Sequence, residues 1–268
     1  MPMQEITLEE WLDEDNPWTA RLMGEDPFQQ TRDAEQIDQE YDHDFYGKRL
    51  ARFQADPERF ERTPLYGEPS EIVASVGDRL FRMPHSGFVG IKRNAFLALL
   101  DRFEVSGELC ELGAGNGQNH VWLQASQNRP VYGGEYSKNA VELAGHLGFD
   151  IAHFNFYEPN DYSLIRPNST VFTFHAVEQI PDAHCIIAGL KSRREQVDRV
   201  IHLEPLYRPD REGLFGRLRN RYAEINDYNL NLLSCLEEDP DILIEHAEKD
   251  AFGNNPLNPA SIIVWRFR

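Results

Sequence analysis

A glycine-rich segment at residues 111–117, with the sequence E-L-G-A-G-N-G, most constrains how this chain folds. It follows a strand-like run at 107–112 and precedes a helix-like run at 121–126. Glycines at alternate positions let the backbone turn tightly and let a ligand approach it without an intervening β-carbon. Backbone amides at the start of a helix also favour polar or charged ligand groups. The segment therefore predicts a ligand-binding turn between a strand and a helix. A purely structural turn is the alternative if the segment is considered alone.

Strand-like and helix-like runs alternate on both sides of this segment. The further strand-like runs are 131–135, 151–156, 170–174 and 199–203, and the helix-like runs are 94–103, 121–126, 139–148 and 183–191. Strands separated by helices of this length form crossover connections in a parallel sheet. Two more strand-like runs, 241–248 and 261–267, are joined by the turn-rich segment 253–259 and predict a closing antiparallel pair. The chain is thus expected to have an α/β fold.

The remaining segments differ from this alternating region. Residues 1–93 are polar and acidic and predict short helices, the first of them marked by Thr7 with Glu10 three residues later, a helix-start signal. Aromatic side chains in this segment favour docking onto the body of the protein over a loose tail. We expect a helical N-terminal segment or lid at 1–93. The α/β domain then covers 94–268 and carries a helical cap insertion at 205–240.

The composition of the chain is strongly acidic. Lysine and arginine number 27 against 45 aspartate and glutamate residues, which gives a formal net charge of -18. The electrostatic field of such a negatively charged protein repels phosphate backbones, so nucleic acid is not expected as a partner. A local basic patch is the one exception that the sequence offers, formed by Arg208, Arg211, Arg217, Arg219 and Arg221.

The cysteines and the apolar stretches indicate in which cellular compartment the protein is expected. Cys110, Cys185 and Cys235 share no CxxC spacing, so they predict neither a disulfide framework nor a metal site, and a reducing cytoplasm fits them. Residues 1–18 lack the layout of a signal peptide. The longest apolar stretches, such as 95–100, are too short to cross a bilayer. We therefore expect no membrane partner.

Glu135 provides a second signal that agrees with the glycine segment. It ends the strand-like run 131–135, 18 residues after Gly117. A carboxylate at this place can accept hydrogen bonds from both ribose hydroxyls of a nucleoside. A nicotinamide dinucleotide site expects G-x-G-x-x-G, but Gly117 comes one residue early for that pattern. Glu111 before the glycines suits a positively charged ligand better than a pyrophosphate.

The E-L-G-A-G-N-G segment resembles the first motif of class I S-adenosylmethionine-dependent methyltransferases, and the order of elements is similar to that family from about Gly107 to Glu204. The resemblance implies a Rossmann-like, mostly parallel seven-stranded sheet with an antiparallel last strand, and S-adenosylmethionine as the cofactor. It also implies that Glu135 binds the ribose and that Asn155 and Phe156 lie at the adenine, although the family more often has an aspartate near Asn155. Core packing is the alternative role for Phe156. The cofactor-binding residues implied are Glu111, Gly113, Ala114, Gly115, Asn116, Gly117, Glu135, Tyr136, Asn155, Phe156 and His175.

The candidate catalytic residues are His175 and Glu178, after the fourth strand of the alternating region, and Glu204, after the fifth. Methyl transfer depends mainly on positioning, so a catalytic base is optional. His175 can take a proton from a hydroxyl acceptor, whereas the two glutamates can hold a cationic one. The alternatives are that His175 only hydrogen-bonds the backbone beside the cofactor and that Glu204 caps the next segment.

The cap insertion carries the candidate substrate-binding residues, Tyr222, Asn226 and Tyr228, which combine stacking surface with hydrogen-bonding groups. A solvated helix face with one buried tyrosine is the alternative for these residues. Residues 175–181 lack the Asn/Asp-Pro-Pro-Tyr sequence of enzymes that methylate DNA bases. The predicted function is therefore methyl transfer to an oxygen or nitrogen of a small-molecule acceptor. An NAD-dependent oxidoreductase and a non-catalytic nucleoside-binding domain remain as alternatives, and the sequence is compatible with a homodimer.

Overall fold

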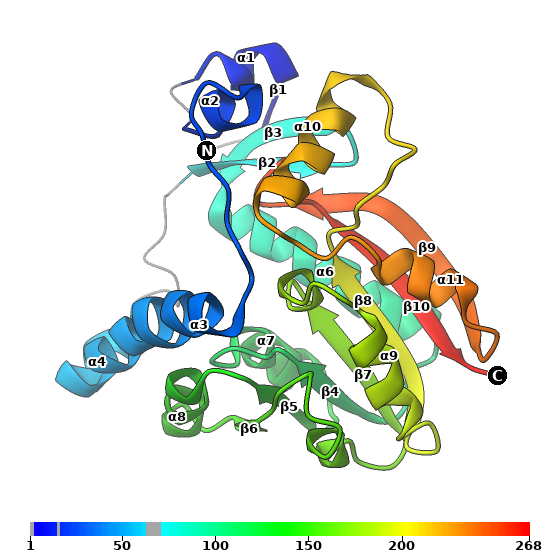
Figure 1. The fold of residues 1–268 in the computed structure, drawn as a ribbon. Coiled ribbons are helices and arrows are strands. Elements are labelled where there is room, and N and C mark those ends of the chain that lie inside the picture. The colour runs from blue at the N-terminus through cyan, green and yellow to red at the C-terminus, as the bar shows by residue number, and fades with distance from the viewer. Residues whose placement is uncertain (1–2, 15–16, 63–70) are drawn as a thin grey trace.

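A computed structural model describes residues 3–14, 17–62 and 71–268 (Figure 1). Its first helical elements are α1 (Leu8–Leu12), α2 (Pro17–Met23), α3 (Ala34–Ile37), the π-helix η1 (Asp38–Gly47), α4 (Lys48–Ala55), α5 (Pro57–Arg62) and α6 (His85–Arg102). The later ones are α7 (Gln118–Ser126), α8 (Lys138–His146), η2 (Asp161–Leu164), η3 (Val177–Gln179), α9 (His184–Lys191), α10 (Gly213–Ile225) and α11 (Leu232–Glu238). The strands are β1 (Gln4–Ile6), β2 (Glu71–Val76), β3 (Arg79–Pro84), β4 (Glu108–Leu112), β5 (Val131–Glu135), β6 (Asp150–His153), β7 (Ser169–Phe174), β8 (Val197–Glu204), β9 (Ile242–Gly253) and β10 (Ala260–Phe267).

All strands lie in one mixed sheet, in the order β1-β3-β2-β9-β10-β8-β7-β4-β5-β6. The pairs β4–β5, β4–β7, β5–β6 and β7–β8 are parallel, whereas β10 is antiparallel to both β8 and β9. The predicted α/β fold and its closing antiparallel pair are confirmed. The strands predicted from the sequence correspond to β4 through β10.

Among the described residues the sheet has ten strands rather than the expected seven, because the N-terminal segment adds three. The hairpin of β2 and β3 turns at Gly77, whose φ of +59° suits a tight turn, and joins the sheet through β9. The segment expected to be helical therefore contains strands as well as helices. The two strands on either side of Gly77-Asp78 are short. A hairpin of this length is stable mainly because it pairs with a larger sheet, which the local sequence does not show.

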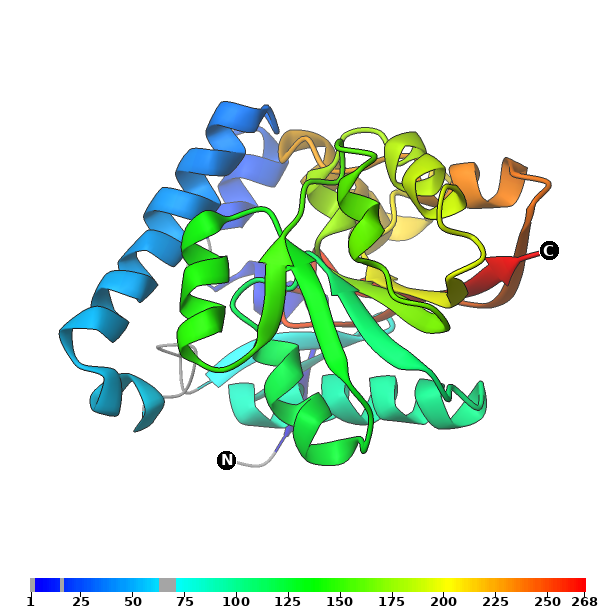
Figure 2. The same cartoon turned by 90° about the horizontal axis from the view of Figure 1, so that it is seen from below.

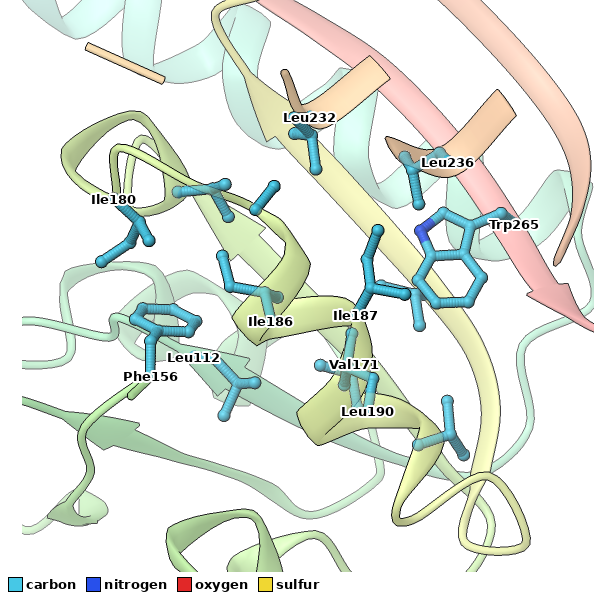
Figure 3. Close-up of a cluster of buried hydrophobic side chains, with 14 of the residues drawn as sticks. Leu112, Phe156, Val171, Ile180, Ile186, Ile187, Leu190, Leu232, Leu236 and Trp265 are labelled. Atoms are coloured by element: carbon cyan, nitrogen blue, oxygen red, sulfur yellow. The ribbon is translucent and has the colours of Figure 1, made fainter. Parts of the chain in front are cut away.

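Alternate side chains of each central strand enter opposite cores, as strand geometry requires. Cys110 and Val171 belong to the core that contains α9 and α11, whereas Leu109 and Phe172 belong to the core that contains α6 and α7. Figure 3 shows the first of these cores, with Trp265 of β10 beside the helices. The two cores make a three-layer arrangement with the sheet in the middle, seen from below in Figure 2.

The N-terminal helices lie along one side of this body. The elements α3, η1 and α4 follow one another without a break (Figures 1 and 2). Of these, η1 and α4 pack against α8, with Leu50 and Phe53 buried on Leu143. A separate cluster of buried hydrophobic side chains joins α1 and α2 to α10 of the insertion. The predicted start of α1 is confirmed, since Thr7 and Glu10 form a reciprocal capping box. Within the described part of the chain, no helix combines the length and apolar character needed to cross a membrane.

Candidate active site

The glycine-rich segment forms the predicted tight turn between β4 and α7. Gly113, Gly115 and Gly117 have φ angles of +79°, +55° and +85°. Residues with a β-carbon rarely adopt this left-handed backbone conformation. A β-carbon at Gly115 would also collide with the hydroxyl of Tyr46, and one at Gly113 would collide with Ala176. The backbone of this turn thus needs glycine for both its conformation and its close contacts.

Glu135 ends β5, the strand next to β4 in the sheet. Its carboxylate is 9% exposed and accepts hydrogen bonds of 2.8 Å from the backbone amides of Gly115 and Ser137. Burial raises the pKa of Glu135, against the lowering effect of these backbone hydrogen bonds. Each carboxylate oxygen has a second position for a donor, so Glu135 can still accept hydrogen bonds from a ligand.

Two cavities meet at the glycine turn. The first, which we call the aromatic cavity, has a volume of about 380 Å³ and is lined by Glu135, Tyr136, Asn155, Phe156, Tyr41 and Tyr157, among others. The second, the polar cavity, has a volume of about 390 Å³ and is lined by Lys92, Glu111, Asn116, Glu178, Asn254 and Asn258, among others. Tyr46, Gly113 and His175 line both cavities. A ligand that lies across the turn can therefore reach from one cavity into the other.

His175, Glu178 and Glu204 form a connected cluster beside this shared wall. His175 Nδ1 lies 3.0 Å from Glu178 Oε2, an oxygen that also accepts a 2.9 Å hydrogen bond from Asn258 Nδ2. Glu204 is 1% exposed and accepts from the amides of Ala176 at 3.0 Å and Glu178 at 3.3 Å. Glu204 thus fixes the backbone that presents the other two side chains.

Charges within the cluster shift the pKa values of its side chains. Burial lowers the pKa of His175, but the charge of Glu178 and the hydrogen bond to it raise the pKa above its ordinary value of 6.5. Burial and the charge of Glu178 raise the pKa of Glu204 to about 7. His175 also has a φ of +53°, and such unfavourable backbone conformations concentrate at functional sites. The arrangement can hold and move a proton near neutral pH.

The N-terminal segment contributes site residues that the sequence did not reveal. Tyr41 and Tyr46 of η1 line the cavities, and Asp42 ties this helix to the body. The Asp42 carboxylate accepts from Ser137 Oγ at 2.6 Å and from the Asn139 amide at 2.9 Å. The only sequence signal for this contact was the aromatic content of the segment, which predicted docking without its position.

Two other groups of lining residues come from distant parts of the chain. His85, Phe88 and Lys92 of α6 face the polar cavity, near the region where α6 follows β3. Asn254 and Asn258 reach it from the turn between β9 and β10. His85, Phe88 and Lys92 belong to the segment 1–93 that the sequence predicted as a helical segment or lid. No local motif connects Asn254 and Asn258 with the glycine turn, because only the folded sheet brings them together.

Tyr222 and Asn226 of the insertion line neither cavity. Tyr222 is buried with its ring 4.7 Å from that of Trp18, and Asn226 Nδ2 donates to the Tyr222 carbonyl at 2.8 Å. Tyr228 also lies outside both cavities, with its ring 6.0 Å from that of Tyr222. The insertion approaches the site by its backbone instead, since the Asn229 amide donates to the Glu178 carbonyl at 2.9 Å. Tyr222 and Tyr228 thus join the insertion to the N-terminal segment, through Trp18 and Arg32 respectively, whereas the Asn226 side chain bonds within the insertion.

The basic patch is largely neutralised within the protein. Arg208, Arg211 and Arg219 all form ion pairs with the buried carboxylate of Asp250. Charges compensated in this way add little attraction for phosphate groups.

A group of metal-type ligands lies outside both cavities. Asp182, His184 and Cys235 bring one ligand atom each to within 4.8 Å of one another. His184 Nδ1 is already 2.6 Å from Asp182 Oδ1, which also accepts from Asn231 Nδ2 at 2.8 Å. These hydrogen bonds connect the start of α9 with the start of α11, which is a structural role.

Comparisons with known proteins find likeness in structure only. No protein-family model matches the sequence, and no curated protein matches it. Among solved structures, the chain is similar to an S-adenosylmethionine-dependent methyltransferase from Anabaena variabilis, with 15% identity, 82% of this chain and 93% of that chain covered, and a TM-score of 0.47. It is also similar to magnesium protoporphyrin IX methyltransferase from Synechocystis, with 17% identity, 66% and 82% covered, and a TM-score of 0.48.

Proposed function

We propose that this chain is an S-adenosylmethionine-dependent methyltransferase that acts on an oxygen or nitrogen of a small molecule. The observation that carries the proposal is the hydrogen bond from the Gly115 amide to the Glu135 carboxylate at the wall of the aromatic cavity. A carboxylate held at the end of a strand beside a glycine turn is suited to the hydroxyls of a ribose. Tyr136 and Phe156 give the same cavity aromatic surface for a flat base.

The residues of the polar cavity fit a nucleoside that carries an amino acid. Asn116 is 1% exposed, and neither atom of its side-chain amide has a hydrogen-bond partner among the described residues. Buried polar atoms without partners are costly and need an explanation. A charged amino-acid group bound here would satisfy them, so the residues present fit this cofactor.

The bound cofactor would supply a methyl group on a positively charged sulfur. The cluster at the shared wall would act on the acceptor. With Nδ1 of His175 donating to Glu178, Nε2 is left to take a proton from a hydroxyl acceptor. Glu178 lines the polar cavity and adds negative charge that would instead hold an amine acceptor, with the buried Glu204 behind it. The acidic composition favours a neutral or cationic small molecule over nucleic acid.

The two alternative functions make different predictions about binding. A nicotinamide enzyme would bind NAD, whereas the carboxylate Glu111 behind the glycine turn disfavours a pyrophosphate. A non-catalytic domain would bind the nucleoside without turnover of any acceptor. The cluster of His175, Glu178 and Glu204 favours catalysis over simple binding.

Isothermal titration calorimetry with S-adenosylhomocysteine and with NAD tests the proposal. We expect binding of S-adenosylhomocysteine at about micromolar dissociation constants, which corresponds to about -8 kcal/mol, and no heat with NAD. Binding of NAD without binding of S-adenosylhomocysteine would overturn the assignment. Methyl transfer from labelled S-adenosylmethionine to a panel of phenols, alcohols and amines then separates an enzyme from a binding domain.

A further inference from the structure

Lys92 brings a positive charge to the α6 side of the polar cavity, where it has no carboxylate partner. Its half-buried Nζ lies 4.5 Å from the ring centroid of Phe174, and it forms no ion pair with any described residue. Burial lowers the pKa of Lys92 to about 8, whereas the charge of Glu111 acts in the opposite direction. A half-buried ammonium group of this kind gains stability when an anion binds beside it.

The carboxylates of Glu111 and Glu178, which also line this cavity, are engaged by other donors. Glu111 Oε1 accepts a hydrogen bond of 2.5 Å from an amide side chain of α7. Glu178 Oε2 accepts from Asn258 Nδ2 at 2.9 Å and lies 3.0 Å from His175 Nδ1. Lys92 is therefore left to attract an anion from outside the protein.

The surroundings of Lys92 form an aromatic wall that leads to the candidate base. Phe88 lines the cavity on the same helix. The Phe174 ring, which Lys92 approaches, stacks on the ring of His175 with centroids 5.6 Å apart and an angle of 26° between the planes. Burial lowers the pKa of His175, Glu178 raises it above its ordinary value, and the charge of Lys92 makes a smaller lowering contribution. Lys92 is thus within electrostatic reach of the histidine.

We propose that the acceptor is an aromatic hydroxy acid, a small molecule with a carboxylate and a phenolic hydroxyl on one ring, and that Lys92 binds its carboxylate. In this arrangement the ring packs on Phe88 and Phe174, and the hydroxyl faces His175. A phenol, with a pKa near about 10, loses its proton to a histidine more easily than an aliphatic alcohol does. The inference rests on the proposed function and narrows its acceptor class.

The acidic composition of the chain does not oppose such an acceptor. Exposed charges are screened over about 8 Å at physiological ionic strength, whereas partly buried pairs are screened much less. The net charge of -18 therefore repels a long polyanion much more than a molecule with a single carboxylate. Recognition of a small anion in the cavity depends mainly on the ammonium group next to it.

Matched acids and amides test the inference without any turnover. The probes are the three positional isomers of hydroxybenzoate, each compared with the hydroxybenzamide of the same pattern by isothermal titration calorimetry, with and without S-adenosylhomocysteine. Each amide keeps the shape of its acid but lacks the charge. We expect at least one acid to bind about 10- to 100-fold more tightly than its amide, because hydrogen bonds between charged groups are stronger than neutral ones.

Variants of Lys92 connect this preference to its side chain. Lys92→Met should weaken the preferred acid by about 10- to 100-fold and change its amide by no more than about twofold, because methionine keeps the aliphatic packing on Phe174. Lys92→Arg keeps the charge and should retain a preference for the acid. Lys48→Met is the matched control, since it removes an exposed lysine of α4 that pairs with Asp44 at 2.8 Å, and it should change neither affinity. The affinity for S-adenosylhomocysteine should stay within about twofold in all three variants.

The outcomes separate failure of the inference from failure of the proposed function. The inference is wrong if no acid binds more tightly than its amide, or if Lys92→Met weakens acid and amide equally. It is also wrong if Lys92→Met weakens S-adenosylhomocysteine and leaves the acids unchanged, which would assign Lys92 to the cofactor. In each of these cases the cofactor assignment stands. Failure of the folded wild-type protein to bind S-adenosylhomocysteine overturns the proposed function, and the acceptor role of Lys92 with it. Thermal denaturation of each variant reports whether it is folded.

Discussion

The carboxylate of Glu135 accepts a 2.8 Å hydrogen bond from the backbone amide of Gly115, 20 residues earlier in the chain. This bond joins the glycine turn after β4 to the end of β5, so two elements of the candidate cofactor site are held together before a ligand binds. Preorganisation of this kind reduces the cost of ordering the site on binding.

Replacing Glu135 tests its role toward the ribose. We expect Glu135→Ala to weaken binding of S-adenosylhomocysteine by about 10- to 100-fold, because hydrogen bonds to a charged acceptor contribute about 1.5–3 kcal/mol. Calorimetry measures the change, and Glu142→Ala, an exposed carboxylate on α8, serves as the matched control. Unchanged affinity together with an unchanged melting curve would exclude the ribose role.

Gly115→Val should abolish cofactor binding and lower the melting temperature. Valine is disfavoured at a φ of +55°, and its β-carbon would displace the Tyr46 hydroxyl from the turn. Gly145→Ala on α8 is the control, since nothing lies within 4 Å of its β-carbon position. It should bind normally and be slightly more stable, because alanine favours helix over glycine. Normal binding by Gly115→Val would show that the ligand does not use this turn.

His175→Asn distinguishes a hydroxyl acceptor from an amine acceptor. Asparagine tolerates the left-handed backbone of this position, so the fold should persist. With a hydroxyl acceptor, turnover should fall by about 10²–10⁴-fold while the affinity for S-adenosylhomocysteine changes little. Wild-type turnover should then rise with pH through the elevated pKa of His175, as the base form appears.

With an amine acceptor, the same histidine variant should have little effect. Glu178→Gln should instead raise the KM for the acceptor, because a carboxylate that holds a cation is lost. Steady-state kinetics of both variants with an acceptor from the screened panel decides between the two cases. Near-normal turnover in both would mean that positioning alone drives the reaction.

The buried cluster also makes stability depend on pH. The pKa of Glu204 is about 7 in the folded protein against a reference value of 4.5, so its contribution is complete below the reference value and is lost as pH rises through 7. The loss amounts to about 3 kcal/mol at most. Glu178 raises this pKa and His175 lowers it, while the raised pKa of His175 itself acts on stability in the same direction.

The Glu204→Gln variant has no ionisable side chain at this position. Its melting temperature should therefore fall less than that of the wild-type protein as pH rises from about 5 to about 8.5. Differential scanning fluorimetry across this range measures the difference. Parallel pH profiles for the two proteins would show that Glu204 does not titrate in this window.

Asp42→Ala should detach the N-terminal helix from the body. The carboxylate accepts hydrogen bonds from Ser137 Oγ and the Asn139 amide, and its loss should reduce the free energy of unfolding by about 1–3 kcal/mol. Burial raises the pKa of Asp42, but these hydrogen bonds outweigh it and lower the pKa overall. The wild-type stabilisation is therefore present above the reference value of 3.8 and lost as pH falls through the folded pKa.

Chemical denaturation measures this change, with Asp44→Ala, an exposed neighbour, as the control. Equal stability of the two variants would show that the Asp42 contacts contribute nothing measurable. Because η1 also carries Tyr46, we expect Asp42→Ala to weaken cofactor binding as well.

The sequence by itself determined the central strands and the place of the candidate site. Each strand from β4 to β8 was visible as a short strand-like run, and all consecutive runs except the pair 151–156 and 170–174 were separated by a helix-like segment. Gly115 and Glu135 could be assigned to one edge, because the carboxyl ends of neighbouring parallel strands meet there. These features follow from local periodicity and from rules of chain connection, which one sequence displays directly.

Only the tertiary structure decided which distant side chains complete the site. Tyr46 reaches the glycine turn from η1, Lys92 from α6, and Asn258 from the turn between β9 and β10. The hairpin that widens the sheet pairs with β9, far along the chain. Conversely, Tyr222 proved to pack on Trp18 rather than to line a cavity. Local periodicity shows which face of an element is apolar, but the partner of that face depends on long-range packing, which no local pattern encodes.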